Sequence, residues 1–131
     1  MRRLRRAMRA AGVAGRELSL TLSNDAELHA LNRQYAGEDH ATDVLSFEQS
    51  GALLGDVIIS VETAARQART AGHSLLDELT HLAVHGLAHL CGLDHATPAE
   101  ERVMFGWEAK LRAEARGRSA VKRQKKPAAR V

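Results

Sequence analysis

Three histidines in the second half of the chain have a spacing that could bind a metal ion. They lie in the segment HGLAHLCGLDH, residues 85–95, and are His85, His89 and His95. His85 and His89 are four residues apart, so on a helix both imidazoles project from the same face. Gly92 can end this helix and reverse the chain, which lets His95 swing back toward the other two. Three neutral nitrogen ligands with one open position are typical of a catalytic zinc site. The sequence therefore predicts one bound Zn²⁺ ion.

The residues around this segment include groups that could assist catalysis, but none of them is an obvious general base. His81, one turn before the first ligand, is interpreted as structural, with a hydrogen bond to a ligand as the alternative. Cys91 should point away from the ligands and pack as a small apolar residue. Asp94 either acts beside the ligands, by hydrogen-bonding an imidazole or orienting a bound water, or caps the turn. Asp43, Asp56 and Asp94 are candidate catalytic helpers, and the base itself is unknown.

The histidine spacing is that of the metzincin protease pattern HExxHxxGxxH, with one departure. Gly86 stands where those proteases have the glutamate that takes a proton from the metal-bound water. Without that carboxylate, peptide hydrolysis is not expected. Zinc can still lower the pKa of bound water to about 7. Hydrolysis with a better leaving group, or with a base elsewhere, therefore stays open.

Length and composition indicate one domain. The chain has 131 residues, of which 44% are hydrophobic and only 3% are aromatic, so the core should be built from aliphatic side chains. The single cysteine excludes an intramolecular disulfide, and the cytoplasm is the expected location. No apolar run reaches the about 18 residues of a membrane span, and no membrane partner is expected.

Charge is distributed unevenly along the chain. Residues 1–16 hold six Arg and residues 116–131 hold seven Lys or Arg, whereas all sixteen acidic residues lie between Glu17 and Glu114. Basic ends of this kind commonly engage a polyanion such as RNA. The alternative is that they only keep the chain in solution. The tail 116–131 is predicted to be disordered, because its composition cannot build a core.

Periodicity and capping residues predict helices that alternate with a few strands. The ELSLTL segment at 17–22 and the runs at 44–47 and 53–60 are predicted strands, and the last two could form an antiparallel hairpin. Helices are predicted at 1–11, from Ser23 or Asn24 to Gly37, at 61–71, from Ser74 to Gly92 and from Thr97 to about residue 111.

With these motifs in place, the chain resembles the YbeY family, bacterial rRNA maturation factors regarded as zinc-dependent single-strand endoribonucleases. Beside the histidine segment, the family's order is matched by TDVLSF at 42–47, LGDVIIS at 54–60, DELTHLAVHG at 77–86, and Met104 with Glu108. The resemblance implies an α/β (α+β) fold, in which a small mixed β-sheet is packed by helices and the zinc site lies on the helix and turn of residues 85–95.

The resemblance also implies a function. Carried over position by position, the family's three metal ligands are His85, His89 and His95. The expected activity is cleavage of single-stranded RNA in 3′-end maturation of small-subunit (16S) rRNA and in ribosome quality control. The expected partners are RNA and the ribosome, with the oligomeric state open. A non-catalytic, zinc-stabilised ribosome-binding or RNA-binding factor is the alternative, and a zinc protease comes third.

Two departures from the family pattern concern the first half of the chain. Ala36 stands where the family usually has an arginine thought to be important for activity, and Arg33, one turn earlier, is the candidate substitute. The family also has a strand before its first helix, which this chain lacks, so either the sheet is one strand short or the true start lies upstream. Residues 1–115 are expected to form the single metallohydrolase domain, followed by the basic tail.

Overall fold

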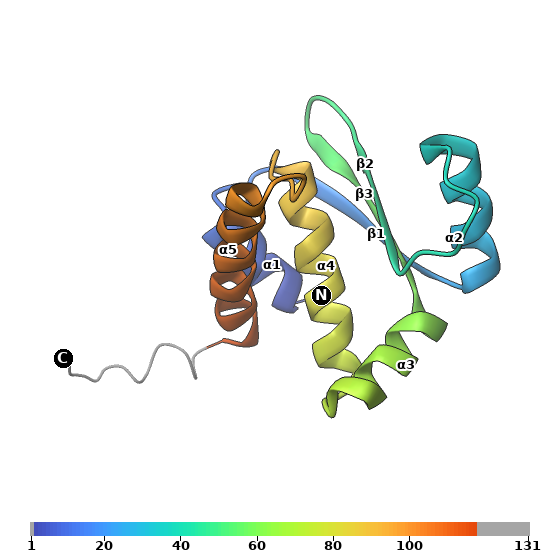
Figure 1. Cartoon of the computed structure of the whole chain (residues 1–131). Coiled ribbons are helices and arrows are strands. Elements are labelled where there is room, and N and C mark those ends of the chain that lie inside the picture. Colours follow the sequence, from blue (N-terminus) through green and yellow to red (C-terminus); the bar gives the residue numbers. More distant parts are fainter. Residues whose placement is uncertain (1, 118–131) are drawn as a thin grey trace.

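The computed structural model of the chain describes residues 2–117, which form an α+β fold with one three-stranded sheet (Figure 1). The strands are β1 (Glu17–Ser23), β2 (Val44–Glu48) and β3 (Leu53–Ser60). The helices are α1 (Arg2–Ala10), α2 (Asp25–Leu31) with a π-helical turn η1 (Asn32–Ala36), α3 (Val61–Ala71), α4 (Leu75–Leu90) and α5 (Pro98–Arg116). Among these, no helix is long and apolar enough to cross a membrane.

The sheet is mixed, as predicted, and β2 lies at its edge. The strand order is β1-β3-β2, with β1 parallel and β2 antiparallel to β3. The predicted hairpin is confirmed, since Val44 pairs with Ile59 and Glu48 pairs with Gly55. Helix α4 contacts β2 and β3, and Figure 1 shows α2 on the opposite side of the sheet. One long side of β2 therefore remains available beside α4.

The core lies between the sheet and helices α1, α4 and α5, and it is aliphatic, as predicted. Its fully buried members include Val57, Ile59, Leu87 and Leu111. Helix α4 approaches β3 very closely at Gly86, where a Cβ atom would lie 2.7 Å from Cγ1 of Val57. Only a residue without a side chain fits this contact unless Val57 shifts. Helix α4 is thereby held firmly on the sheet.

Local capping signals located most helix ends correctly. Asn24 is the N-cap of α2, Thr97 forms a capping box with Glu100 at the start of α5, and Gly92, with φ of 92°, follows the end of α4. The helix predicted to run to Gly37 changes at Asn32 into the η1 turn. Asn32 is buried there, and its side-chain amide donates to the backbone oxygen of His40. Helix α5 extends to Arg116, and residues 118–131 of the predicted tail lie outside the described residues.

Candidate metal centre

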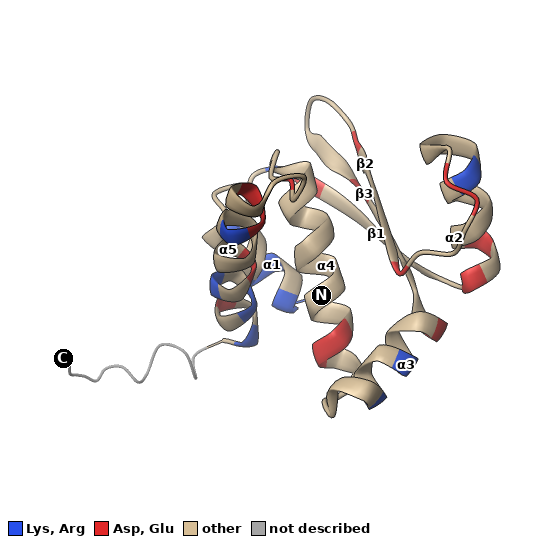
Figure 2. Cartoon of the chain, viewed as in Figure 1, with Lys and Arg blue, Asp and Glu red and all other residues tan. Residues whose placement is uncertain are grey.

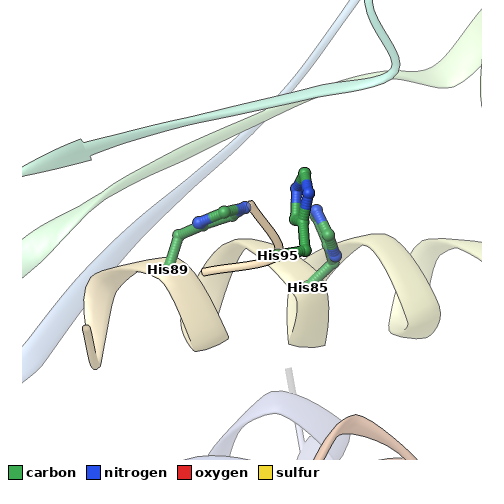
Figure 3. Close-up of side chains that lie close together, drawn as sticks. All are labelled: His85, His89 and His95. Atoms are coloured by element: carbon green, nitrogen blue, oxygen red, sulfur yellow. The ribbon is translucent and has the colours of Figure 1, made fainter. Parts of the chain in front are cut away.

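Helix α4 and the turn after it bring the three predicted histidines together. His85 and His89 lie one turn apart on α4, and the left-handed Gly92 reverses the chain so that His95 returns to them. One ring nitrogen from each lies within 4.8 Å of the other two. Figure 3 shows the three rings gathered beside α4 on the side that faces β2.

This arrangement fits a single metal ion. Zinc–nitrogen bonds of about 2.0–2.1 Å in a tetrahedral site place the nitrogen ligands about 3.3 Å apart. Small side-chain rotations are enough to reach that spacing from the one observed. His85 and His89 are half-buried and His95 is exposed, so an ion held by these residues would be accessible from solvent. A site with three protein ligands and one open position is what metal-assisted hydrolysis requires.

A buried carboxylate from α5 holds the first histidine. Nδ1 of His85 donates a hydrogen bond to Oε2 of Glu108 at 2.6 Å, and Glu108 is only 2% exposed. This bond raises the pKa of His85, while partial burial opposes the rise. It also fixes the ring so that Nε2 is the nitrogen left for a metal ion. The sequence assigned no role to Glu108, although a carboxylate between Met104 and Leu111 on an apolar helix face was a usable signal.

The surroundings of His89 favour its neutral form, the form that binds a metal ion. Partial burial lowers its pKa, and the charges of His85 and His95 lower it further. An imidazole that loses its proton readily keeps a lone pair available for a metal ion. The three histidines therefore combine one ring oriented by a carboxylate with another that resists protonation.

The histidines lie at one wall of a cleft of about 570 Å³, and the edge strand β2 forms the opposite wall. The lining residues outside the cluster are Thr42, Asp43, Val44, Leu45, Ser46, Glu48 and Leu90. They include two carboxylates, and none of these described lining residues is Lys or Arg. The cleft therefore has groups that can accept a proton but no lining cation that could pair with a phosphate.

Asp43 is the acidic candidate that reaches this cleft in an ordered position. The side-chain amide of Gln67, on α3, donates to Oδ2 of Asp43 at 3.2 Å, and the backbone oxygen of Asp43 accepts from Ser60 at 2.9 Å. The negative charge of Asp43 contributes to raising the pKa of His85, after the larger effect of Glu108. Asp43 thus lines the same cleft as the histidine cluster.

The other two acidic candidates have different surroundings. Asp56 accepts a hydrogen bond from Gln49 across the β2–β3 hairpin and does not line the cleft. Oδ1 of Asp94 accepts from the backbone nitrogen of His95 at 2.7 Å. Of the two interpretations of Asp94, the structure supports the one in which it shapes the turn.

His81 and Cys91 stay outside the histidine cluster. Nδ1 of His81 accepts a hydrogen bond from Arg112 on α5 at 3.1 Å, and burial, followed by the charge of Arg112, lowers the His81 pKa. Cys91 is partly buried and packs against the core, as predicted for a small apolar residue.

The candidate substitute for the missing arginine does not reach the cleft. Arg33 is 65% exposed, and its guanidinium lies 3.8 Å from the carboxylate of Asp39. Neither Arg33 nor Ala36 lines the cleft. In this structure, therefore, no guanidinium from this part of the chain enters the metal centre.

Fold and site together define a small α+β protein in which a helix and a turn present three histidines to a cleft beside an edge strand. A family model described as Endoribonuclease YbeY matches residues 2–116, and the chain belongs to this YbeY family. The resemblance seen in the sequence is thus confirmed.

Relatives from several bacteria support this assignment. The chain is 53% identical to Endoribonuclease YbeY of Moorella thermoacetica, with 73% of this chain and 71% of that protein covered. The corresponding protein of Bacillus licheniformis is 46% identical, with 72% and 69% covered, and that of an Anaeromyxobacter species is 49% identical, with 78% and 56% covered. The match therefore spans about half to seven tenths of the length of these relatives.

A solved structure shows the same fold. The solution structure of the Thermotoga maritima protein TM1509 superposes with a TM-score of 0.64 and is 26% identical. It covers 98% of this chain, and this chain covers 87% of it.

Proposed function

We propose that this protein is a zinc-dependent endoribonuclease that cleaves single-stranded RNA in the 3′-end maturation of small-subunit (16S) rRNA and in ribosome quality control. Family membership and the name shared by its relatives support RNA hydrolysis. The single observation that carries the metal dependence is the cluster of His85, His89 and His95, with ligand atoms within 4.8 Å of one another.

In this proposal His85, His89 and His95 hold the zinc ion. Bound zinc supplies a Lewis acid and lowers the pKa of a water molecule. Glu108 keeps His85 in the tautomer that offers Nε2. Asp43, held by Gln67 on the cleft wall, accepts the proton of the oxygen that attacks the scissile phosphate.

Peptide hydrolysis fits the structure less well. A metzincin-type base would have to occupy position 86, and that position packs against Val57 with no space for a side chain. The absence of the glutamate is therefore tied to how α4 packs on the sheet.

One observation favours a second candidate function, a non-catalytic zinc-stabilised factor that binds RNA or the ribosome. The described residues lining the cleft include Asp43 and Glu48 but no Lys or Arg, and Ala36 replaces the family's arginine. A phosphodiester in the transition state is stabilised by cations placed against its oxygens. Binding without cleavage is the outcome expected if the metal ion alone does not supply this stabilisation.

The deciding experiment is cleavage of a single-stranded RNA that contains the small-subunit rRNA 3′ end, by wild type, His89→Ala and His29→Ala. His29 is partly exposed on α2, paired with Asp39 and outside the cleft, so it is the matched control. The endoribonuclease is supported if wild type and His29→Ala cleave the RNA, if a chelator abolishes this cleavage, and if His89→Ala does not cleave. Binding without cleavage supports the second candidate, and equal cleavage by all three proteins contradicts a metal-dependent nuclease.

We further propose that residues 1–115 act as a single domain with the basic tail 116–131 as an additional RNA contact. The family match over residues 2–116 and the seven Lys or Arg in residues 116–131 support this arrangement. The cytoplasm is the proposed location, because the proposed partner is the ribosome.

A further inference from the structure

A second hollow, separate from the histidine cluster, lies between α1, α4 and α5. It has a volume of about 260 Å³ and is lined by Arg3, His73, Asp77, Thr80, His81, Arg112 and Arg116, which we call the Arg112 pocket. None of these residues lines the metal cleft. The pocket therefore holds a group of basic side chains that the proposed zinc chemistry does not use.

The contacts in this pocket leave positive charge in excess. Arg3 pairs with Asp77 at 2.8 Å and also donates to Thr80. Arg112 donates to His81, which burial and the neighbouring guanidinium keep neutral, so its own charge is not compensated there. Within residues 2–117, neither Arg112 nor Arg116 forms an ion pair with a carboxylate.

His73, the remaining basic residue of the pocket, already has a partner. His73 contacts the carboxylate of Glu78 at 2.6 Å, and Glu78 is only 5% exposed. The charge available to a ligand therefore comes from the arginines of α5.

The pocket and the metal centre lie along the same pair of helices. Helices α4 and α5 run antiparallel there, because His85 pairs with Glu108 and His81, one turn earlier, pairs with Arg112, one turn later. Asp77, at the far end of the pocket, lies eight residues before His85, which is about 12 Å along a helix axis. A single strand with one phosphate at the histidines can therefore reach the pocket with another.

We propose that the Arg112 pocket binds a backbone phosphate of the RNA strand a few nucleotides from the bond that is cleaved. This inference rests on the proposed endoribonuclease function and adds a subsite to it. Guanidinium groups pair well with phosphate oxygens, and a hollow of this size accommodates one phosphate group. Because no Lys or Arg lines the metal cleft within the described residues, the strand must find its cationic partners elsewhere.

The surroundings of the pocket favour a polyanion over a small free anion. Figure 2 shows basic residues on both α1 and α5, the two helices packed beside α4. Arg2, Arg3 and Arg6 of α1 line an adjoining hollow, and the sequence after Gly117 holds six further Lys or Arg. An extended chain of phosphates can use all of these charges, whereas a single inorganic phosphate can use only those of the pocket.

The test is a scan of the RNA backbone with the zinc-loaded full-length protein. Each oligonucleotide of a set carries one neutral methylphosphonate in place of a phosphate, and the position of this group moves stepwise away from the cleavage site. The dissociation constant of the protein is measured for every oligonucleotide. We expect one position, a few nucleotides from the cleaved bond, to weaken binding about tenfold, the size of a lost charge-assisted hydrogen bond. In Arg112→Gln and Arg116→Gln the affinity for unmodified RNA should already be about tenfold lower, with no further loss at that position.

Arg102→Gln is the matched control, because Arg102 is an exposed arginine of the same helix that lines neither hollow. It should give the same scan as wild type. Arg116 is exposed, so Arg116→Gln still tests the subsite if Arg112→Gln fails to fold. A zinc content equal to that of wild type shows that the metal centre of a variant is unchanged.

The possible failures are distinguishable. The phosphate subsite is wrong if the scans of Arg112→Gln and Arg116→Gln keep the sensitive position, or if wild type shows no sensitive position. In that case the endoribonuclease function is still supported as long as His89→Ala abolishes cleavage. If wild type neither binds nor cleaves RNA, the proposed function fails and the subsite fails with it.

Discussion

Replacing Glu108 with glutamine should weaken zinc binding although Glu108 is not itself a ligand. The carboxylate is 2% exposed, and its Oε2 lies 2.6 Å from Nδ1 of His85. Glutamine has nearly the same shape, so the helix packing should be retained. Its neutral amide accepts a weaker hydrogen bond and no longer raises the basicity of the ring.

The size of the effect follows from the role of such partners in other metal sites. Loss of a hydrogen-bond partner behind a histidine ligand costs about 10–100-fold in metal affinity. This range corresponds to about 1.4–2.7 kcal/mol. His85→Ala, which removes the ligand itself, should weaken binding further than Glu108→Gln.

The assay is competition for zinc between the purified protein and a chromophoric chelator at fixed pH. Glu114→Gln is the control, because Glu114 is an exposed glutamate of the same helix and should bind zinc like wild type. A Glu108→Gln protein that binds zinc as tightly as wild type would refute the reasoning. It would mean that the contact with His85 has no influence on the metal centre.

Three further predictions concern other parts of the molecule. Asp43→Asn should lower RNA cleavage about 10²–10⁴-fold while zinc content, measured by metal analysis, stays at the wild-type level; unchanged cleavage would remove Asp43 from the mechanism. Gly86→Ala should destabilise the fold by up to about 2 kcal/mol, measured by urea unfolding. Overpacking against Val57 costs about 1–3 kcal/mol, whereas the gain in helix propensity is about 1 kcal/mol. A more stable variant would contradict this packing. Asp25 has a pKa lowered to about 2 by hydrogen bonds from Ser60, Thr63 and Arg66, so the stability it contributes is present above its ordinary pKa of 3.8 and is lost as the pH falls toward 2. Unfolding of Asp25→Asn should depend less on pH in that window, and an unchanged pH dependence would exclude this role.

Much of the fold and the metal cluster could be predicted because their signals are local. The spacing of His85 and His89 on a helix, the stop at Gly92 and the cap at Thr97 all depend on residues within about one turn of one another. The hairpin between the second and third strands was equally visible, because its two runs are separated by a short turn. Local geometry of this kind is largely independent of the rest of the chain.

What the sequence could not provide were contacts between distant residues. The pairing of His85 with Glu108 joins residues 23 positions apart, and that of His81 with Arg112 joins residues 31 positions apart. Both depend on how α5 packs against α4, which no local pattern specifies. The change of helix type at Asn32 belongs to the same class, because it accompanies a hydrogen bond to the backbone of His40 eight residues later.

The close contact at Gly86 also separates two properties that many metalloenzymes combine on one helix. Since position 86 has no room for a carboxylate, α4 can provide ligands but not a metzincin-type proton acceptor, and in the proposed mechanism that role falls to Asp43 in the loop before β2. Metal affinity and reaction rate are then governed by different segments of the chain and can change independently during evolution. A member of this family could lose catalysis through substitutions near Asp43 while it keeps its metal ion, its fold and its capacity to bind RNA.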